Sequence, residues 1–425
     1  MKNIKGFLSK ANYGEKSLWL NIFNVLLILY CVKQILDIVL NIYHSTIIDL
    51  NNWGLTEWLI NYQGGFVRRG LIGEMVFQLS CVFNVYPNVI VFVLALLSFC
   101  VAVFFIAKII IKKEWCWWML PMVFFLNDVT PARKDYLIFS AILLLFYLYT
   151  VIKKPIWKFI ILNIVVIVAS NIHEVFFVFV FPFCFLLVLS DSEIQLSKIV
   201  KLLFFIPSIV MFVILGMNIG DNAMAQSIHN SLISIMPIGF PSEPFCSIDA
   251  IGWDPAHFRE GCIRDNFMSS DYGIPVLAVR PLLILLIAYF TSNIIRVFNN
   301  SISEEEHQAQ RTIVYFNMFI AIVMLCTSFD DFTRLIEFWT ITSLVIYTVI
   351  PSRKILAAFP AFFVGIVNKW DGIVCKFLRP NKVLFVLLIL FMGGSSCGLN
   401  FMQAFEHSII GPFIIKSFDL LTNIL

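Results

Sequence analysis

The chain has 425 residues, of which 60% are hydrophobic and only 13% are charged, and its mean hydropathy is +0.89. Soluble domains contain roughly half apolar residues, so this composition excludes a soluble globular or disordered protein and predicts a polytopic membrane protein. The net charge of +3 says little by itself, because in membrane proteins charge matters loop by loop. We expect an all-α fold with one transmembrane domain over residues 1–425.

The apolar runs predict about eleven membrane spans, since a spanning helix needs about 20 mostly apolar residues. The first two are expected at Trp19–Ile42 and Tyr86–Ile111. Polar residues at 171–174 interrupt the long apolar stretch Phe159–Leu189 and predict a turn between two spans. The other spans are expected at 115–126, 136–152 and 199–216, and beginning near 275, 313, 335 and 383.

Two segments between spans are long enough to carry a site. Residues 43–85 form the first external loop, with an amphipathic interfacial helix expected within Trp58–Leu79, and residues 217–274 form the one large external loop. In that large loop Cys246 and Cys262 are predicted to form a disulfide, with two unpaired thiols as the alternative. A third segment, Arg353–Lys382, is amphipathic and basic.

Charge predicts the orientation of the chain. With the amino terminus in the cytoplasm, alternate loops collect most of the 30 Lys and Arg residues, as the positive-inside rule requires. The polar clusters described next are therefore expected on the external side of a membrane that the chain crosses many times.

The first external loop contains the string Gly65-Phe66-Val67-Arg68-Arg69-Gly70. Paired arginines can hold phosphate oxygens in a fork, and they are costly on the side that positive residues avoid. Arg68 and Arg69 are therefore predicted to bind substrate. The alternative is that both snorkel to lipid headgroups.

Two other external helix ends carry ionisable pairs. Arg133 and Lys134 precede the fourth span and are also predicted to bind substrate. The next residue, Asp135, fits a helix cap about as well as a catalytic role. His173 and Glu174 lie inside an apolar stretch and are predicted to be catalytic, with His173 as the proton acceptor and Glu174 orienting it or sharing the role. Capping by the pair is the alternative.

The last external cluster is Asp330-Asp331-Phe332-Thr333-Arg334. One aspartate is expected to pair with Arg334, which is the remaining candidate for substrate binding. Two adjacent carboxylates do not make a converging metal site, so none is predicted. Nucleotide-binding motifs are also absent from the sequence, and no cofactor and no nucleic-acid partner are expected.

This layout resembles the O-antigen or capsule polymerases of the Wzy type and, more broadly, membrane glycosyltransferases of the GT-C kind. The resemblance covers the span pattern, the large late loop and the arginine string of the first loop. It implies that Arg68, Arg69, Arg133 and Arg334 hold the pyrophosphate of a lipid. The implied partners are an undecaprenyl-pyrophosphate-linked oligosaccharide, membrane lipid and a chain-length regulator. The implied location is the bacterial inner membrane, crossed many times, with the site on the periplasmic face.

Three functions are compatible with the sequence. The first is polymerisation of lipid-linked oligosaccharide repeats. The second is transfer of a sugar from a polyprenyl monophosphate to a surface glycan, which would depend on a first-loop carboxylate, Asp37, Asp49 or Glu57. The third is transport of a lipid-linked glycan, ranked last because the midplane looks apolar.

Overall fold

The structure is a computed structural model that describes residues 18–112, 132–191, 194, 196–254, 256, 260, 285, 288–293, 296, 303–327, 332–379, 381–391, 405–406 and 408–422. Every regular element within these ranges is a helix, which confirms the all-α expectation. The span expected at 115–126 lies outside the described residues, and of the span expected to begin near 275 only residues 285, 288–293 and 296 are described, all of them helical.

Most of the expected spans that fall in the described ranges are helices at the expected places. The first two are α2 (Leu18–Tyr43), which continues into the π-helical turn η1 (His44–Ile48), and α5 (Pro87–Lys112). The others are α7 (Asp135–Val151), α8 (Pro155–Ile172), α9 (Val175–Ser190), α10 (Lys198–Leu203), α11 (Ile206–Met217), α16 (Glu304–Thr327), α17 (Phe332–Val349) and α20 (Lys382–Phe391).

Length and hydropathy support the membrane assignment at a coarser level than eleven spans. Within the described residues four helical segments are long and apolar enough to cross a membrane, and a fifth is added if one bent helix pair counts as one span. The four are Asn24–Ile48, Pro87–Lys108, Pro155–Ile172 and Lys198–Met217. The chain is therefore a membrane protein by composition and helix length.

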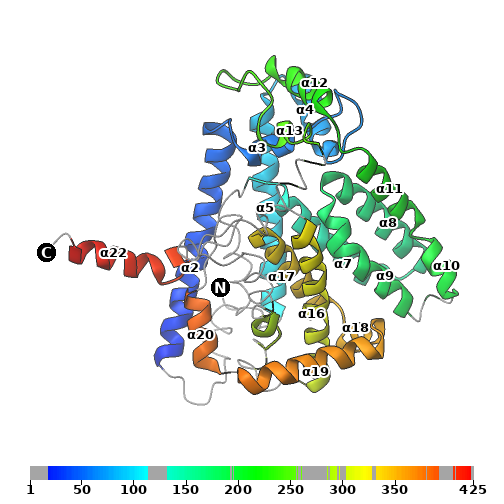
Figure 1. Cartoon of the computed structure of the whole chain (residues 1–425), viewed down its shortest axis with the longest axis vertical. Coiled ribbons are helices and arrows are strands. Elements are labelled where there is room, and N and C mark those ends of the chain that lie inside the picture. The colour runs from blue at the N-terminus through cyan, green and yellow to red at the C-terminus, as the bar shows by residue number, and fades with distance from the viewer. Residues whose placement is uncertain are drawn as a thin grey trace.

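Figure 1 shows how these helices are arranged. α2, α5, α16 and α17 run along the long axis of the molecule, and α7 to α11 lie to one side of them. The loop over residues 43–85 and the described part of the large loop, residues 217–254, meet at one end. This end carries α3 (Trp53–Leu59), α4 (Gly70–Phe83), α12 (Asn222–Ile233) and α13 (Cys246–Asp249). The opposite end carries α18 (Ser352–Ala358) and α19 (Ala361–Phe377).

The interfacial helix expected within Trp58–Leu79 is two helices, α3 and α4, joined by a turn. α3 is buried over residues 54–59, so it is part of the protein core and does not lie on the surface. The chain breaks between the helices because Tyr62 to Arg69 include the positive-φ residues Gly65 and Arg69. This break places the arginine string between two packed helices.

The large external loop is partly helical and packs onto the first loop. The backbone N–H of Ser247 in α13 donates to Thr56 Oγ1 at 3.2 Å, and the Ser247 hydroxyl donates to the Trp53 carbonyl at 3.0 Å. Cys246 is a free thiol in the structure. The disulfide expected between Cys246 and Cys262 is therefore not formed in the structure, although Cys262 itself lies outside the described residues.

Gly73 sets the distance between α4 and the chain after α3. A Cβ at this position would lie 1.8 Å from the carbonyl oxygen of Ile60, which is backbone and cannot rotate away. We expect Gly73→Ala to lower the free energy of unfolding by about 3 kcal/mol, because the two segments must separate. The thermal unfolding of the detergent-purified protein measures this.

The matched control is Gly216→Ala in α11, where a Cβ would meet nothing within 4 Å. This variant should melt at or slightly above the wild-type temperature, because Ala favours a helix over Gly. An unchanged melting temperature for Gly73→Ala would show that the close approach is not a constraint on the fold.

Candidate functional site

The candidate site is built around Glu57, which α3 carries into the interior of the protein. α3 starts at the cap residue Asn52, whose side chain accepts from the N–H of Leu55 at 2.9 Å. At the other end Trp58 Nε1 donates to the carbonyl of Ala132 at 2.5 Å, which joins α3 to the segment before α7. The side chain of Glu57 between them has no exposed surface.

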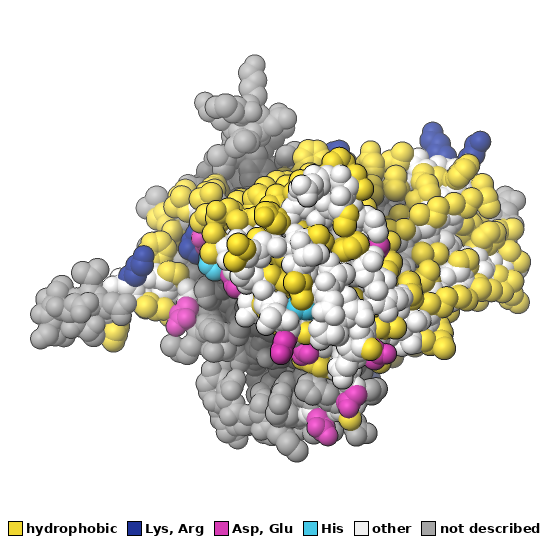
Figure 2. All heavy atoms as spheres, turned by 90° about the horizontal axis from the view of Figure 1, so that it is seen from above, with side chains coloured by type: hydrophobic (Ala, Val, Ile, Leu, Met, Phe, Trp, Pro, Cys, Tyr) yellow, Lys and Arg dark blue, Asp and Glu magenta, His cyan; other side chains and the backbone are white. Residues whose placement is uncertain are grey.

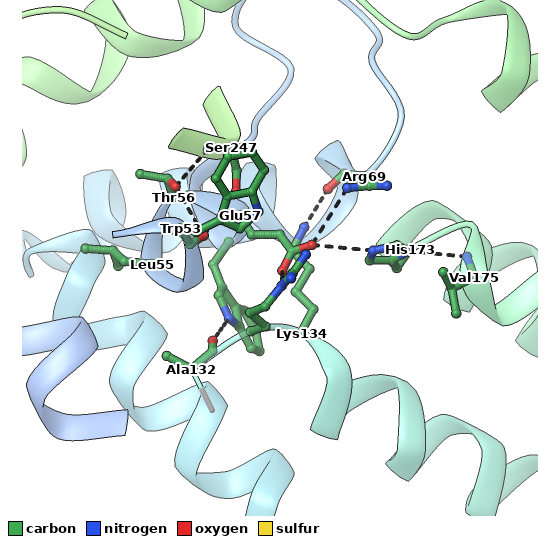
Figure 3. A network of polar contacts seen from close by, with 12 residues as sticks. Trp53, Leu55, Thr56, Glu57, Arg69, Ala132, Lys134, His173, Val175 and Ser247 are labelled. Carbon is green, nitrogen blue, oxygen red and sulfur yellow. Dashed lines mark hydrogen bonds and ion pairs between the residues drawn. The ribbon is translucent and has the colours of Figure 1, made fainter. Parts of the chain in front are cut away.

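Three side chains from distant parts of the chain converge on the Glu57 carboxylate, and Figure 3 labels two of them, Arg69 and His173. Arg133 Nε donates to Oε2 at 3.2 Å. His173 Nε2 lies 3.4 Å from Oε1, and Arg69 Nη1 lies 3.8 Å from the same oxygen. A carboxylate buried in this way is stable only with compensating cations and donors, so Glu57 holds the three segments together.

Arg69 occupies a backbone conformation that is costly for a residue with a side chain. Its φ is 66°, in the left-handed region, immediately before α4. Lys134 Nζ donates to the Arg69 carbonyl at 2.8 Å, and the Arg69 guanidinium makes a two-pronged contact with Glu174. These bonds offset a strain of about 1–3 kcal/mol and fix the direction of the guanidinium.

Glu174 is the carboxylate of the cluster that reaches the surface. Arg69 Nε donates to its Oε2 at 2.8 Å, and Arg68 Nη1 lies 3.6 Å from its Oε1. The side chains of Arg68, Arg69 and Glu174 are 27%, 24% and 19% exposed, whereas that of Arg133 is 8% exposed. The two arginines therefore form the accessible layer of the site, with Glu174 between their guanidiniums.

The pKa of Glu174 lies well below its ordinary value of 4.5. Burial alone would raise the pKa, but the positive charges of Arg69 and Arg68 and the hydrogen bond from Arg69 outweigh it. Glu174 is thus ionised at neutral pH, and it neutralises part of the charge of the two arginines.

His173 is oriented by its neighbours in the turn between α8 and α9. Its Nδ1 accepts a hydrogen bond from the Val175 N–H at 3.2 Å. In the neutral ring this leaves the proton on Nε2, which faces Glu57 Oε1. The side chain is 1% exposed, so in this arrangement His173 supports Glu57 and does not present a free lone pair to a substrate.

The cluster has an excess of positive charge. Arg68, Arg69, Arg133 and Lys134 outnumber the carboxylates Glu57 and Glu174, and they still do if the buried Asp135 is counted. Figure 2 views this end of the molecule, where uncharged side chains dominate, several Asp and Glu side chains are visible, and Lys and Arg appear mainly at the margins. A net cation held below such a surface favours an anionic ligand.

Most of the residues predicted from the sequence meet in this cluster: Arg68, Arg69, Arg133, Lys134, His173 and Glu174. Arg334 lies in the first turn of α17, but its side chain and Asp330-Asp331 lie outside the described part of the structure.

The sequence predicts a role for Glu57 only under the alternative function, single-sugar transfer. A carboxylate within the apolar segment Trp53–Ile60 was the signal that could have placed it at the centre.

Comparison of the chain with protein-family models, with curated proteins and with solved structures finds no match. The assignment of a function therefore depends on the chemistry of the cluster.

The low pKa of Glu174 predicts how pH acts on the site. A carboxylate with a depressed pKa stabilises the fold fully above its ordinary pKa, and this contribution is lost as the pH falls through the folded-state value. The difference in melting temperature between wild type and Glu174→Gln should be constant from about pH 7 to 5 and should shrink below about pH 4.5.

Glu243→Gln is the control, because Glu243 is an exposed carboxylate in the large loop at the same end. It should melt like the wild type throughout this range. A Glu174→Gln difference that does not depend on pH would contradict the ion-pair account of Glu174.

Proposed function

We propose that the protein is a membrane glycosyltransferase whose donor is a sugar linked to a polyprenyl phosphate or pyrophosphate. The observation that carries the proposal is the pair of partly exposed guanidiniums, Arg68 and Arg69, in an excess of positive charge at one end of an apolar helical protein. A lipid-linked phosphate is an anion that can reach such a position from the bilayer.

The conformation of the arginines favours a ligand with several anionic oxygens, such as phosphate, over an anion that offers a single acceptor atom. Arg69 already directs two guanidinium nitrogens at the two oxygens of the Glu174 carboxylate, which is the geometry of a bidentate contact with an oxyanion. In the free protein Glu174 occupies the place between the guanidiniums. A phosphate oxygen would share or take over those donors.

The proposed reaction is a displacement at the anomeric carbon. The acceptor hydroxyl oxygen bonds to that carbon, the bond from the carbon to the donor phosphate oxygen breaks, and its electron pair stays on the phosphate. Arg68 and Arg69 stabilise the charge that develops there. The hydroxyl proton goes to Glu174, the partly exposed carboxylate of the cluster, and His173 keeps its supporting role toward Glu57.

Polymerisation of undecaprenyl-pyrophosphate-linked repeats remains our first proposal for the product, as the layout of the sequence suggests. The same proposal gives the chain about eleven membrane spans and a cytoplasmic amino terminus, and it puts the site on the periplasmic face of a bacterial inner membrane. Lys134 and Arg133 belong to the buried layer, where Lys134 holds the Arg69 backbone and Arg133 pairs with Glu57. Both would act on the lipid phosphate through Arg69 and through their charge.

A second candidate is the transfer of a single sugar from a polyprenyl monophosphate. The observation that favours it is the central position of Glu57, the first-loop carboxylate on which that function was expected to depend. For Glu57 to accept a proton from the substrate, however, Arg69 would have to move, since Glu57 has no exposed surface. Polymerisation predicts lipid-linked oligosaccharides of increasing length, whereas single transfer predicts one added sugar.

The test uses the purified full chain in lipid nanodiscs with radiolabelled undecaprenyl-pyrophosphate oligosaccharide or undecaprenyl-phosphate sugar as probe. We expect Arg69→Ala to lower turnover about a hundredfold, because one contact to the leaving phosphate is lost, and Arg69→Lys to recover part of it. Thin-layer separation of the products measures both rate and product length.

The matched control is Lys198→Ala, which removes an exposed cation at the start of α10, outside the cluster. Its turnover should equal that of the wild type. Full turnover in both Arg68→Ala and Arg69→Ala, or no turnover by wild type with either probe, would refute the proposal.

A further inference from the structure

The helix α19, at the end of the molecule opposite the site, has two unlike faces (Figure 1). Its inner face is buried against α16 through Val367 and Asp371, and Asp371 pairs with Arg311 of α16 at 3.2 Å. The aromatic rings of Phe359 and Phe363 contact Phe316 on the same side. Among the described residues, the contacts that fix α19 to the protein are thus made by its inner face.

The outer face of α19 is a stripe of large apolar side chains, which we call the α19 stripe. Its members recur three or four residues apart and are between 39% and 83% exposed. They are Phe362, Ile366, Trp370, Ile373 and Phe377. A stripe of this length on a helix that also has a buried face needs a covering, because water is a poor solvent for it.

The charged residues beside the α19 stripe indicate what kind of surface covers its apolar side chains. Lys369 and Lys376 are exposed and, at 100° per residue, project along one edge of the stripe. Arg353 and Lys354 of α18 and Arg379 after α19 are exposed as well. Within residues 351–379 the one acidic residue is Asp371, which is buried and paired, so the exposed charge is entirely positive.

The path of the chain into α18 and α19 indicates that α19 lies along a membrane surface and does not cross the membrane. The helical segment Glu337–Tyr347 and α18 meet at an angle of 118°, so the chain turns sharply where α17 ends. α19 then runs across the end of the bundle in Figure 1. An amphipathic helix with an aromatic stripe, flanking lysines and this orientation has the properties of a helix that lies in the headgroup layer.

We propose that α19 is a binding surface for anionic lipid, with the α19 stripe inserted among the acyl chains and Lys369 and Lys376 paired with the headgroups. This function is independent of the proposed glycosyl transfer at the other end. A basic residue near an anionic membrane surface gains about 1 kcal/mol, so two lysines should change the binding of the helix by about tenfold or more.

The test compares full-length protein in nanodiscs of phosphatidylcholine alone with nanodiscs that also contain about 30% phosphatidylglycerol. Hydrogen exchange of the amides of residues 361–377 is measured by mass spectrometry. We expect exchange to be about tenfold slower with the anionic lipid. The double variant Lys369→Gln/Lys376→Gln should lose most of this difference.

The control is Lys153→Gln/Lys154→Gln, which removes two exposed lysines between α7 and α8 and should keep the full lipid effect. Exchange that is equal in the two lipids, or a lipid effect that survives Lys369→Gln/Lys376→Gln, would overturn the proposal. Protection that rises with protein concentration regardless of lipid would also overturn it, because the stripe would then be covered by a second copy of the chain.

Discussion

The burial of the Glu57 charge is the constraint on which the candidate site depends. Removing a carboxylate from water costs several kcal/mol, and this cost is recovered only when cations and donors surround it with good geometry. Here the compensation comes from Arg133, His173 and Arg69, which belong to three separate segments. The same ionic contacts that offset the cost therefore bring the first loop, the start of α7 and the α8–α9 turn together.

The accessible part of the site follows from this buried part. Arg69 keeps its left-handed backbone because Lys134 holds its carbonyl and Glu174 holds its guanidinium. The excess positive charge is then presented at the surface by Arg68 and Arg69. The buried layer supplies position and charge, and the exposed layer supplies the donors that an anionic lipid would contact. Under the two proposals both ends of the protein bind anionic lipid, one for glycosyl transfer and one for attachment through α19.

The sequence predicted a large part of this because its signals are local. Polar residues inside an apolar run predicted the turn between α8 and α9, and runs of apolar residues predicted α2, α5 and α7 closely. The residues of the cluster were predicted as a group because paired charges are costly near a membrane, and their role in a site stays a prediction. The central role of Glu57 was not found, since its partner Arg133 is 76 positions away and only the folded chain shows that they meet. The sequence predicted one helix after the first span where the structure has two, α3 and α4. The break was missed because the apolar pattern does not show the left-handed backbone of Arg69.

The coupling between Glu57 and Arg133 tests the central claim most directly. It is obtained from the free energies of unfolding, in mixed micelles with increasing SDS, of Glu57→Gln, Arg133→Gln and the double variant. Each single change should cost about 3–5 kcal/mol because it leaves a buried charge without its partner, and the double variant should recover at least about 2 kcal/mol of the sum. Costs that add to within about 0.5 kcal/mol would show that Glu57 does not organise the site.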